Sequence, residues 1–275
     1  SGVAFAASNV PLYGVIEEGV VVSKAKHKDT MVDLKAGFDS GNRWGIKGVE
    51  DLGNGYSVGF ILEQGFTADN GNAANANYTT SSGFTRESFM YVTGNFGKLG
   101  FGRTGSLSSA AQSNHILTGW ALGTGLGLSS WTSEIGTSYG RLNNTISYAT
   151  PSFSGLTIHA MYSNGIGEDT NKWSENTHYY GIGAKYQANA IKSSLIFEAV
   201  DNKGGEKNLV GNKVHGDKAY TVNFGFEYNL GSFTPMFAYQ WANQDDGKKT
   251  HMFGLSAKVP VAGGDVLAGA RYLFG

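Results

Sequence analysis

Tyr220-Thr221-Val222-Asn223-Phe224-Gly225-Phe226-Glu227-Tyr228 is the stretch that decides the fold, because its residues alternate strictly in character. The even positions are large and apolar, whereas the odd positions are small or polar. A period of two places these two sets on opposite faces of a β-strand. Residues 233–241 repeat the pattern with the odd positions apolar. The alternation therefore predicts a sheet with one apolar face and one polar face.

The composition indicates which kind of sheet this is. The chain has 41 Gly and 4 Pro, and charged residues make up 16 % of it, against about 25 % in a typical soluble domain. A β-sandwich would carry many charges on its outer face, but here the polar face carries mainly Gly, Ser, Thr and Asn. Mean hydropathy is -0.23, and no apolar run reaches the roughly 18 residues of a spanning helix. We therefore predict an all-β protein, a transmembrane antiparallel β-barrel with lipid outside and water inside.

The connections between the predicted strands alternate between short and long, as in outer-membrane barrels. Roughly thirteen strands can be counted, whereas single-chain bacterial barrels use an even number and leave no unpaired edge in lipid. We therefore expect about three strands to be missing at the C-terminus. Residues 1–8 resemble the remnant of a cleaved signal peptide, with a small-x-small site at Ala4-Phe5-Ala6. The barrel is expected to cover residues 9–275.

Two places interrupt the regular pattern. Residues 104–143 are rich in Gly, Ser, Thr and Leu and show no strand alternation. A segment of this length inside a compact domain indicates a functional loop, which we expect to fold into the lumen and form a constriction. Glu18 lies on the apolar face of a first strand predicted over residues 10–23. A carboxylate facing lipid is costly, so we predict a subunit interface or a bulge at this strand.

Several landmarks follow one another along the chain: Tyr13-Gly14, residues 47–55, Arg86-Glu87-Ser88-Phe89, residues 94–103 and residues 144–148. With these segments in this order, the chain resembles the general trimeric porins of the Gram-negative outer membrane, from about Asn9 to its end. The resemblance implies a sixteen-stranded barrel, of which roughly the first thirteen strands are present, a homotrimer, and a third extracellular loop folded inward at residues 104–143.

Basic residues are the main candidates for the pore wall. The resemblance maps Arg43, Arg86, Arg103 and Arg141 onto the basic cluster that family members place opposite the third loop. Alternation supports an inward position for Arg43, on the same face as Lys47, and for Arg141. Arg103 shares the phase of apolar residues and needs a bulge or turn at Gly102 to point inward.

Acidic residues are sparse on the loop side. Between residues 104 and 140 the only acidic or basic residue besides one histidine is Glu134, while Glu17 and Glu63 are predicted to point inward from the wall. Width and lining charge set pore selectivity, so we expect a general diffusion channel for ions and small hydrophilic solutes with weak anion preference. Trp120 and Trp131 in the loop leave a substrate-specific channel open, and a secreted β-rich adhesin is a third alternative.

Other chemistry is weakly supported by the sequence. No nucleophile, base and orienting group can be assembled, so an enzyme is not expected. The absence of Cys excludes disulfides and thiolate metal sites, and we expect neither a cofactor nor a metal. His159 and His115 are interpreted as pore-lining residues, and Asp245-Asp246 as a solvated turn. A net charge of -1 gives no attraction to nucleic acid, so the expected partners are outer-membrane lipid, ions and solutes.

Overall fold

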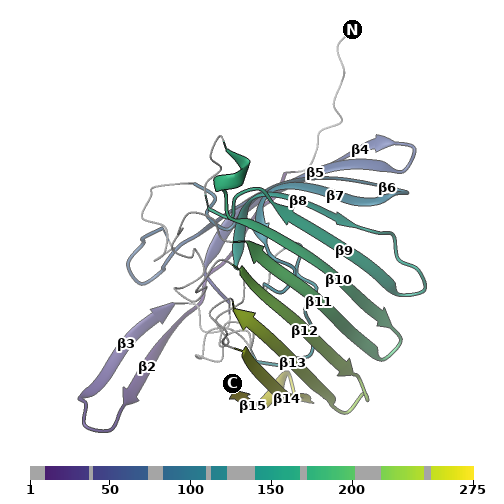
Figure 1. Cartoon of the computed structure of the whole chain (residues 1–275). Helices are drawn as coiled ribbons and strands as arrows, with labels where there is room; N and C mark the ends of the chain where they lie inside the picture. The colour runs from purple at the N-terminus through teal and green to yellow at the C-terminus, as the bar shows by residue number, and fades with distance from the viewer. Residues whose placement is uncertain are drawn as a thin grey trace.

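A single layer of antiparallel strands makes up most of the computed structural model, which describes residues 10–36, 40–73, 83–109, 113–122, 140–167, 172–201, 218–244 and 249–275. Thirteen strands form one curved sheet (Figure 1) in which each strand pairs with its neighbours in the sequence, in the order β1-β4-β5-β6-β7-β8-β9-β10-β11-β12-β13-β14-β15. The strands are β1 (Leu12–Val15), β4 (Arg43–Gly53), β5 (Tyr56–Gly65), β6 (Glu87–Gly94), β7 (Gly97–Gly105), β8 (Arg141–Ala149), β9 (Leu156–Ser163), β10 (His178–Ala188), β11 (Ile191–Asp201), β12 (Lys218–Tyr228), β13 (Thr234–Gln244), β14 (Lys249–Val261) and β15 (Gly264–Phe274).

The predicted all-β antiparallel architecture is confirmed. Short connections such as 189–190 and 262–263 join the strands at one end, which we call the short-turn edge, and long ones such as 66–86 and 106–140 join them at the opposite end, the long-loop edge. Within the described ranges β1 and β15 are the two outermost strands of the sheet and do not pair with each other. The only helix there is the 3₁₀ turn η1 (Trp173–Glu175). No helix in the same ranges is long and apolar enough to cross a membrane.

The first strand departs from the prediction, because residues 10–23 do not form one strand. β1 stops at Val15, and β2 (Glu18–Lys24) pairs instead with β3 (Thr30–Ala36) in a separate hairpin that projects from the main sheet (Figure 1). Asn42 Oδ1 accepts the Glu17 N–H at 2.6 Å, and a Glu17 carboxylate oxygen accepts the Ser40 N–H at 2.8 Å. These bonds satisfy the backbone at the break. Glu18 therefore opens the hairpin and is not part of a barrel strand.

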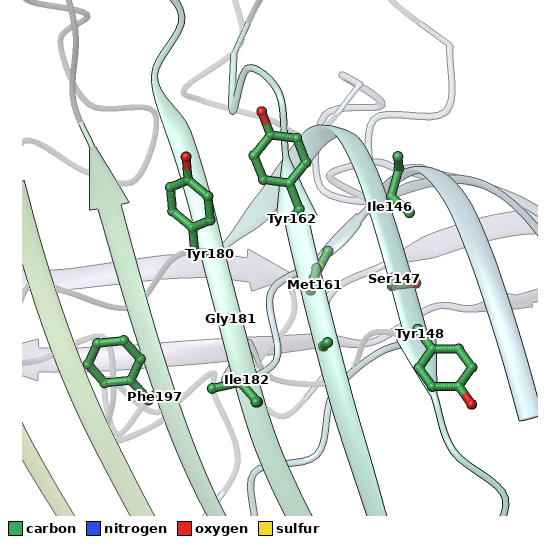
Figure 2. A pocket seen from close by; sticks show the side chains of 10 residues that line it. Ile146, Ser147, Tyr148, Met161, Tyr162, Tyr180, Gly181, Ile182 and Phe197 are labelled. Carbon is green, nitrogen blue, oxygen red and sulfur yellow. The ribbon is translucent and has the colours of Figure 1, made fainter.

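The outer face of the sheet carries apolar and aromatic side chains. Leu195 and Ile182 are 53 % and 54 % exposed, as expected for side chains that face lipid. Small Ala160 leaves a groove of about 470 Å³ between larger neighbours. Figure 2 shows the hydroxyls of Tyr162 and Tyr180 pointing toward one end of the strands and that of Tyr148 toward the other. Tyrosines oriented in this way suit the aromatic girdles at the two membrane interfaces.

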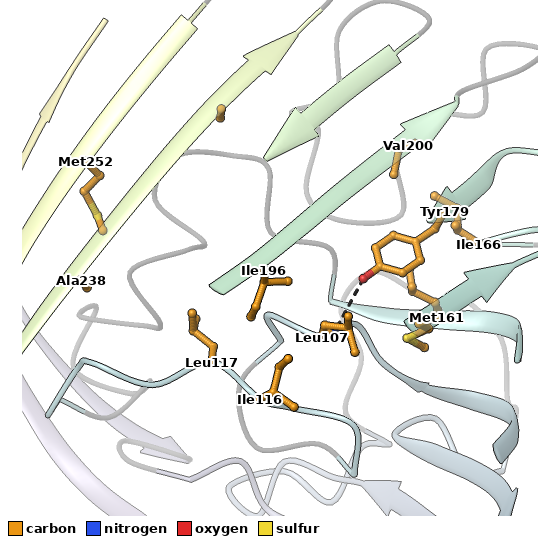
Figure 3. Close-up of a cluster of buried hydrophobic side chains, with 12 residues drawn as sticks. Leu107, Ile116, Leu117, Met161, Ile166, Tyr179, Ile196, Val200, Ala238 and Met252 are labelled. Atoms are coloured by element: carbon orange, nitrogen blue, oxygen red, sulfur yellow. Dashed lines mark hydrogen bonds between the residues drawn. The ribbon is translucent and has the colours of Figure 1, made fainter. Parts of the chain in front are cut away.

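The apolar core lies between the inner face of the sheet and the segment that follows β7. Leu107, Ile116 and Leu117 from that segment pack against wall residues that include Tyr179 and Ile196 (Figure 3). The Tyr179 hydroxyl also accepts the Leu107 N–H at 3.4 Å. Leu107 and Ile116 are 1 % and 3 % exposed, so burying each side chain stabilises the docked segment by about 1.5–3 kcal/mol. The interior of the barrel is thus partly filled by its own loop.

Candidate pore constriction

The described parts of the loop after β7, residues 106–109 and 113–122, lie against the inner face of the sheet. Its backbone contacts strands that are far apart in the sequence. The Thr118 N–H donates to Ser194 Oγ of β11 at 3.1 Å, and the Ala121 N–H donates to Ser256 Oγ of β14 at 3.0 Å. The loop therefore crosses the inner face from β7 toward the C-terminal strands.

Four wall glycines make room for this path. A Cβ built on Gly183 would lie 2.7 Å from Ile116 Cδ1, and one on Gly225 would fall on the Thr118 carbonyl oxygen. Glycine within a strand often marks a place where another chain segment approaches closely. We call Gly183, Gly225, Gly254 and Gly269 the glycine track. Trp120 lies over its far end, with ring carbons 2.9 Å and 3.0 Å from Cβ atoms built on Gly254 and Gly269.

Three wall carboxylates hold the loop by its main chain. Glu87, Glu198 and Glu227 accept the backbone N–H groups of Ser113, Ser108 and Gly119, at 3.2, 3.3 and 3.0 Å respectively. None of these glutamates was predicted to hold the loop, and Glu87 appears in the prediction only within the landmark of residues 86–89. The available sequence signal was that strand alternation points these side chains inward, opposite a loop that carries almost no charge.

Glu198 is the centre of the most buried of these contacts. It is 0 % exposed and also accepts hydrogen bonds from the Tyr179 hydroxyl at 2.8 Å, Asn223 Nδ2 at 3.2 Å and Thr221 Oγ1 at 3.4 Å. These donors stand on β10 and β12, on either side of the Glu198 strand. Burying a carboxylate is costly unless it is hydrogen-bonded, and here four groups satisfy it.

The predicted arginines lie where the long connections join β4, β6, β7 and β8. Arg43 is the first residue of β4, and Arg86 directly precedes β6. The Glu63 carboxylate lies between them, 2.5 Å from Arg86 Nε and 3.6 Å from Arg43 Nε, and accepts the Tyr13 hydroxyl at 3.0 Å. The Glu63 carboxylate therefore partly neutralises the positive charge of Arg43 and Arg86.

Arg103 and Arg141 extend this basic group to β7 and β8. The strand pairing shifts between Gly102 and Thr104, and Gly102 has φ +118°, which confirms the predicted bulge. Arg103 donates to the Thr85 carbonyl oxygen at 2.9 Å and to Asn143 Oδ1 at 2.5 Å. Arg141 interacts electrostatically with Arg86 and Arg103. Its Nε is buried without a hydrogen-bond partner among the described residues.

The remaining candidates lie beside the arginines, elsewhere on the wall or outside the described residues. The Lys47 ammonium is 5.1 Å from the centre of the Tyr13 ring. Glu17, at the break after β1, accepts the Ser40 N–H, and Arg43 donates to Ser40 Oγ at 3.1 Å. His159 contacts Thr157 Oγ1 at 3.0 Å. Within the described ranges no group of three or more His, Asp or Glu side chains could hold a metal. Glu134, Trp131 and Asp245-Asp246 lie outside those ranges.

His115 is the one titratable side chain in the described parts of the loop, residues 106–109 and 113–122. Burial lowers the pKa of this imidazole below its ordinary value of 6.5, and the nearby Lys185 lowers it further. The ring Nδ1 has no hydrogen-bond partner in the described part of the chain. His115 is therefore neutral at pH 7 and adds no charge to the loop.

A one-layer antiparallel sheet, apolar outside and polar inside, with a loop folded against its inner face, defines the class of outer-membrane barrel channels. A family model described as "Gram-negative porin" matches residues 1–274, and the chain belongs to this family. It is thus a porin of the Gram-negative outer membrane. A secreted adhesin, the third alternative, is excluded.

Relatives of known name agree with this assignment. The chain is 28 % identical over 269 residues to "Outer membrane porin protein 32" of Delftia acidovorans, covering 96 % of this chain and 73 % of the relative. It is 31 % identical over 188 residues to "Major outer membrane protein P.IB" of Neisseria meningitidis serogroup B, covering 66 % and 51 % of the two chains. The chain therefore spans about half the length of some of the relatives it matches.

Solved structures give the same fold. The structure titled "Anion-selective porin from Comamonas acidovorans" matches with a TM-score of 0.71 and 26 % identity, over 96 % of this chain and 78 % of that one. Outer-membrane expressed OmpT of Vibrio cholerae matches with a TM-score of 0.62, over 98 % and 77 % of the two chains. At 14 % identity the latter likeness shows the fold alone.

Proposed function

We propose that this porin is a general diffusion channel with weak anion preference, in which the inward loop and the arginines at the long-loop edge form the constriction. The observation that carries the proposal is the imbalance of charge at this edge. Arg43, Arg86, Arg103 and Arg141 lie there with three described carboxyl groups, Glu17, Glu63 and Glu87. Glu17 accepts the Ser40 N–H beside Arg43, and Glu87 is engaged by the loop backbone. Excess positive charge in a narrow, low-dielectric passage raises the local concentration of anions.

The name of one structural relative supports the sign of this preference. The solved structure with a TM-score of 0.71 is titled an anion-selective porin. Glu63 tempers the basic group here, and Glu134 on the loop is expected to temper it further, which is why the proposed preference is weak.

A substrate-specific channel is the less favoured alternative. That function needs aromatic rings exposed along the solute path. Trp120 instead lies flat on the glycine track, partly buried against the loop core. In planar bilayers, current through a general channel should not show saturable block by neutral sugars.

We also propose a homotrimer, as the family resemblance implies. Chemical cross-linking in detergent, read on a denaturing gel, should give a ladder that ends at three subunits. A ladder that ends at one or two subunits would contradict this proposal.

The charge proposal is tested by reversal potentials of the full chain in planar bilayers under a KCl gradient. We expect the wild type to favour chloride, and Arg43→Gln with Arg86→Gln to shift the potential strongly toward potassium. Removing the negative charge at Glu134 should shift it modestly the other way. Lys172→Gln is the matched control, because this lysine is exposed and pairs with Glu175 at 2.8 Å. A wild type that favours potassium would refute the proposal.

A further inference from the structure

A second basic group lies on the inner face of the sheet, away from the arginines. Lys98 of β7 is opposite Ala149 of β8, which is opposite His159 of β9, which in turn is opposite Gly183 of β10. Directly opposed residues of antiparallel strands project from the same face. Gly183 belongs to the glycine track, so this row faces the lumen. Lys185 follows two residues after Gly183 and shares its face.

Ala149 places only a methyl group between Lys98 and His159, which are two strand spacings apart, about 10 Å between backbones. The space over Gly183 is filled by Ile116 of the loop, whose Cδ1 is 2.7 Å from a Cβ built there, so the row lies beside the docked loop. Both Lys98 and Lys185 interact electrostatically with His159. The group stands near the short-turn edge of the sheet, whereas the arginines stand at the long-loop edge.

The Glu87 carboxylate interacts electrostatically with Lys98 but does not form an ion pair with it. The Lys98 ammonium is 4.3 Å from the centre of the Tyr91 ring and 5.6 Å from that of Phe89. These cation–π contacts hold it in place without neutralising it. In the described ranges neither Lys98 nor Lys185 forms an ion pair, whereas Lys192 lies 4.0 Å from Glu227.

Neutral hydrogen-bonding groups complete the row. His159 Nε2 and Thr157 Oγ1 are 3.0 Å apart, and Thr157 is directly opposite Lys185. Two lysines with an imidazole and a hydroxyl suit a compact oxyanion with two negative charges, because lysine binds phosphate as a point charge and the neutral groups hydrogen-bond the remaining oxygens.

We propose that Lys98, His159 and Lys185 form a binding subsite for inorganic phosphate on the short-turn side of the loop. The inference rests on the proposed function in so far as anions that pass the arginines reach this subsite next. An anion held there occupies the lumen and impedes the flow of chloride.

The test is a phosphate titration of the chloride current through the full chain in planar bilayers at constant ionic strength. The wild-type current should fall saturably, and Lys98→Ala or Lys185→Ala should raise the half-blocking concentration about five- to tenfold. Lys98→Arg should keep most of the block, because it keeps both the charge and the contact with the rings. Lys192→Ala is the matched control and should behave like the wild type.

A second measurement keeps the result independent of current. Broadening of the ³¹P resonance of phosphate by the detergent-solubilised protein should be lost in Lys185→Gln and retained in Lys192→Ala. Absence of block in the wild type, or equal block in Lys98→Ala, Lys185→Ala and Lys192→Ala, overturns the subsite. Chloride preference without such block leaves the proposed function standing, whereas block in a channel that favours potassium refutes the proposed function alone.

Discussion

Replacing Gly225 by alanine should release the inward loop from the wall. The added Cβ would fall on the carbonyl oxygen of Thr118, and the opposing atoms are backbone on both sides, so the loop must move away. Three hydrogen bonds from loop backbone N–H groups lie near this point: Thr118 to Ser194 at 3.1 Å, Gly119 to Glu227 at 3.0 Å and Ala121 to Ser256 at 3.0 Å. Two neutral bonds at about 1 kcal/mol each and one to a carboxylate at about 2 kcal/mol give a loss of about 4 kcal/mol.

The assay is hydrogen exchange of the loop amides in detergent micelles. A loss of about 4 kcal/mol corresponds to a roughly 10³-fold faster exchange at Thr118 and Gly119, since 1.4 kcal/mol is a factor of ten. Single-channel conductance should rise and become noisier. Gly264→Ala is the control, because a Cβ there meets nothing within 4 Å. Unchanged protection at residues 118–121 in the Gly225→Ala protein would refute the close approach of loop and wall.

Two further predictions concern the buried anchor and the loop histidine. Glu198→Leu removes the acceptor of four donors and should destabilise the docked loop by about 3–5 kcal/mol, whereas Glu198→Gln should destabilise it less. Thermal unfolding followed by near-UV circular dichroism compares the two variants, and equal stability would contradict the hydrogen-bond network. Burial lowers the pKa of His115 in the docked loop, so the undocked loop takes up a proton more readily. The stability of the docked loop is therefore greatest above pH 6.5 and decreases as the pH falls toward the lowered pKa. Exchange at the Ile116 amide should accelerate from pH 7 to pH 5 after correction for intrinsic rates, and His115→Gln should abolish this dependence; an unchanged slope would count against it.

The faces of the regular strands could be predicted from alternation because each side chain of a barrel meets either lipid or lumen. The stretch 220–228 lies within β12 (Lys218–Tyr228), and its odd positions face inward as predicted: Gly225 and Glu227 contact the loop, and Thr221 and Asn223 contact Glu198. The bulge at Gly102 was likewise predictable, since the phase of Arg103 conflicted with its apolar neighbours.

The break after β1 could not be read in the same way. Apolar alternation continues through Ile16 and into β2, so the sequence pattern does not show where the strand leaves the sheet. The Glu17 N–H at the break donates to the Asn42 side chain, which comes 25 residues later in the sequence. The anchoring glutamates were missed for a related reason: their partners are backbone N–H groups, which every residue except proline carries and which no sequence pattern displays.

The way in which the loop is attached bears on how freely such a channel can diversify. Glu198 and Glu87 accept main-chain N–H groups at positions 108 and 113, and this part of the attachment does not depend on which side chain stands there. Position 119 is different, because its φ of +97° favours glycine. Substitutions at many loop positions can thus change the side chains that line the pore while these backbone hydrogen bonds remain. Evolution or an engineer can retune permeability here without redesigning the barrel.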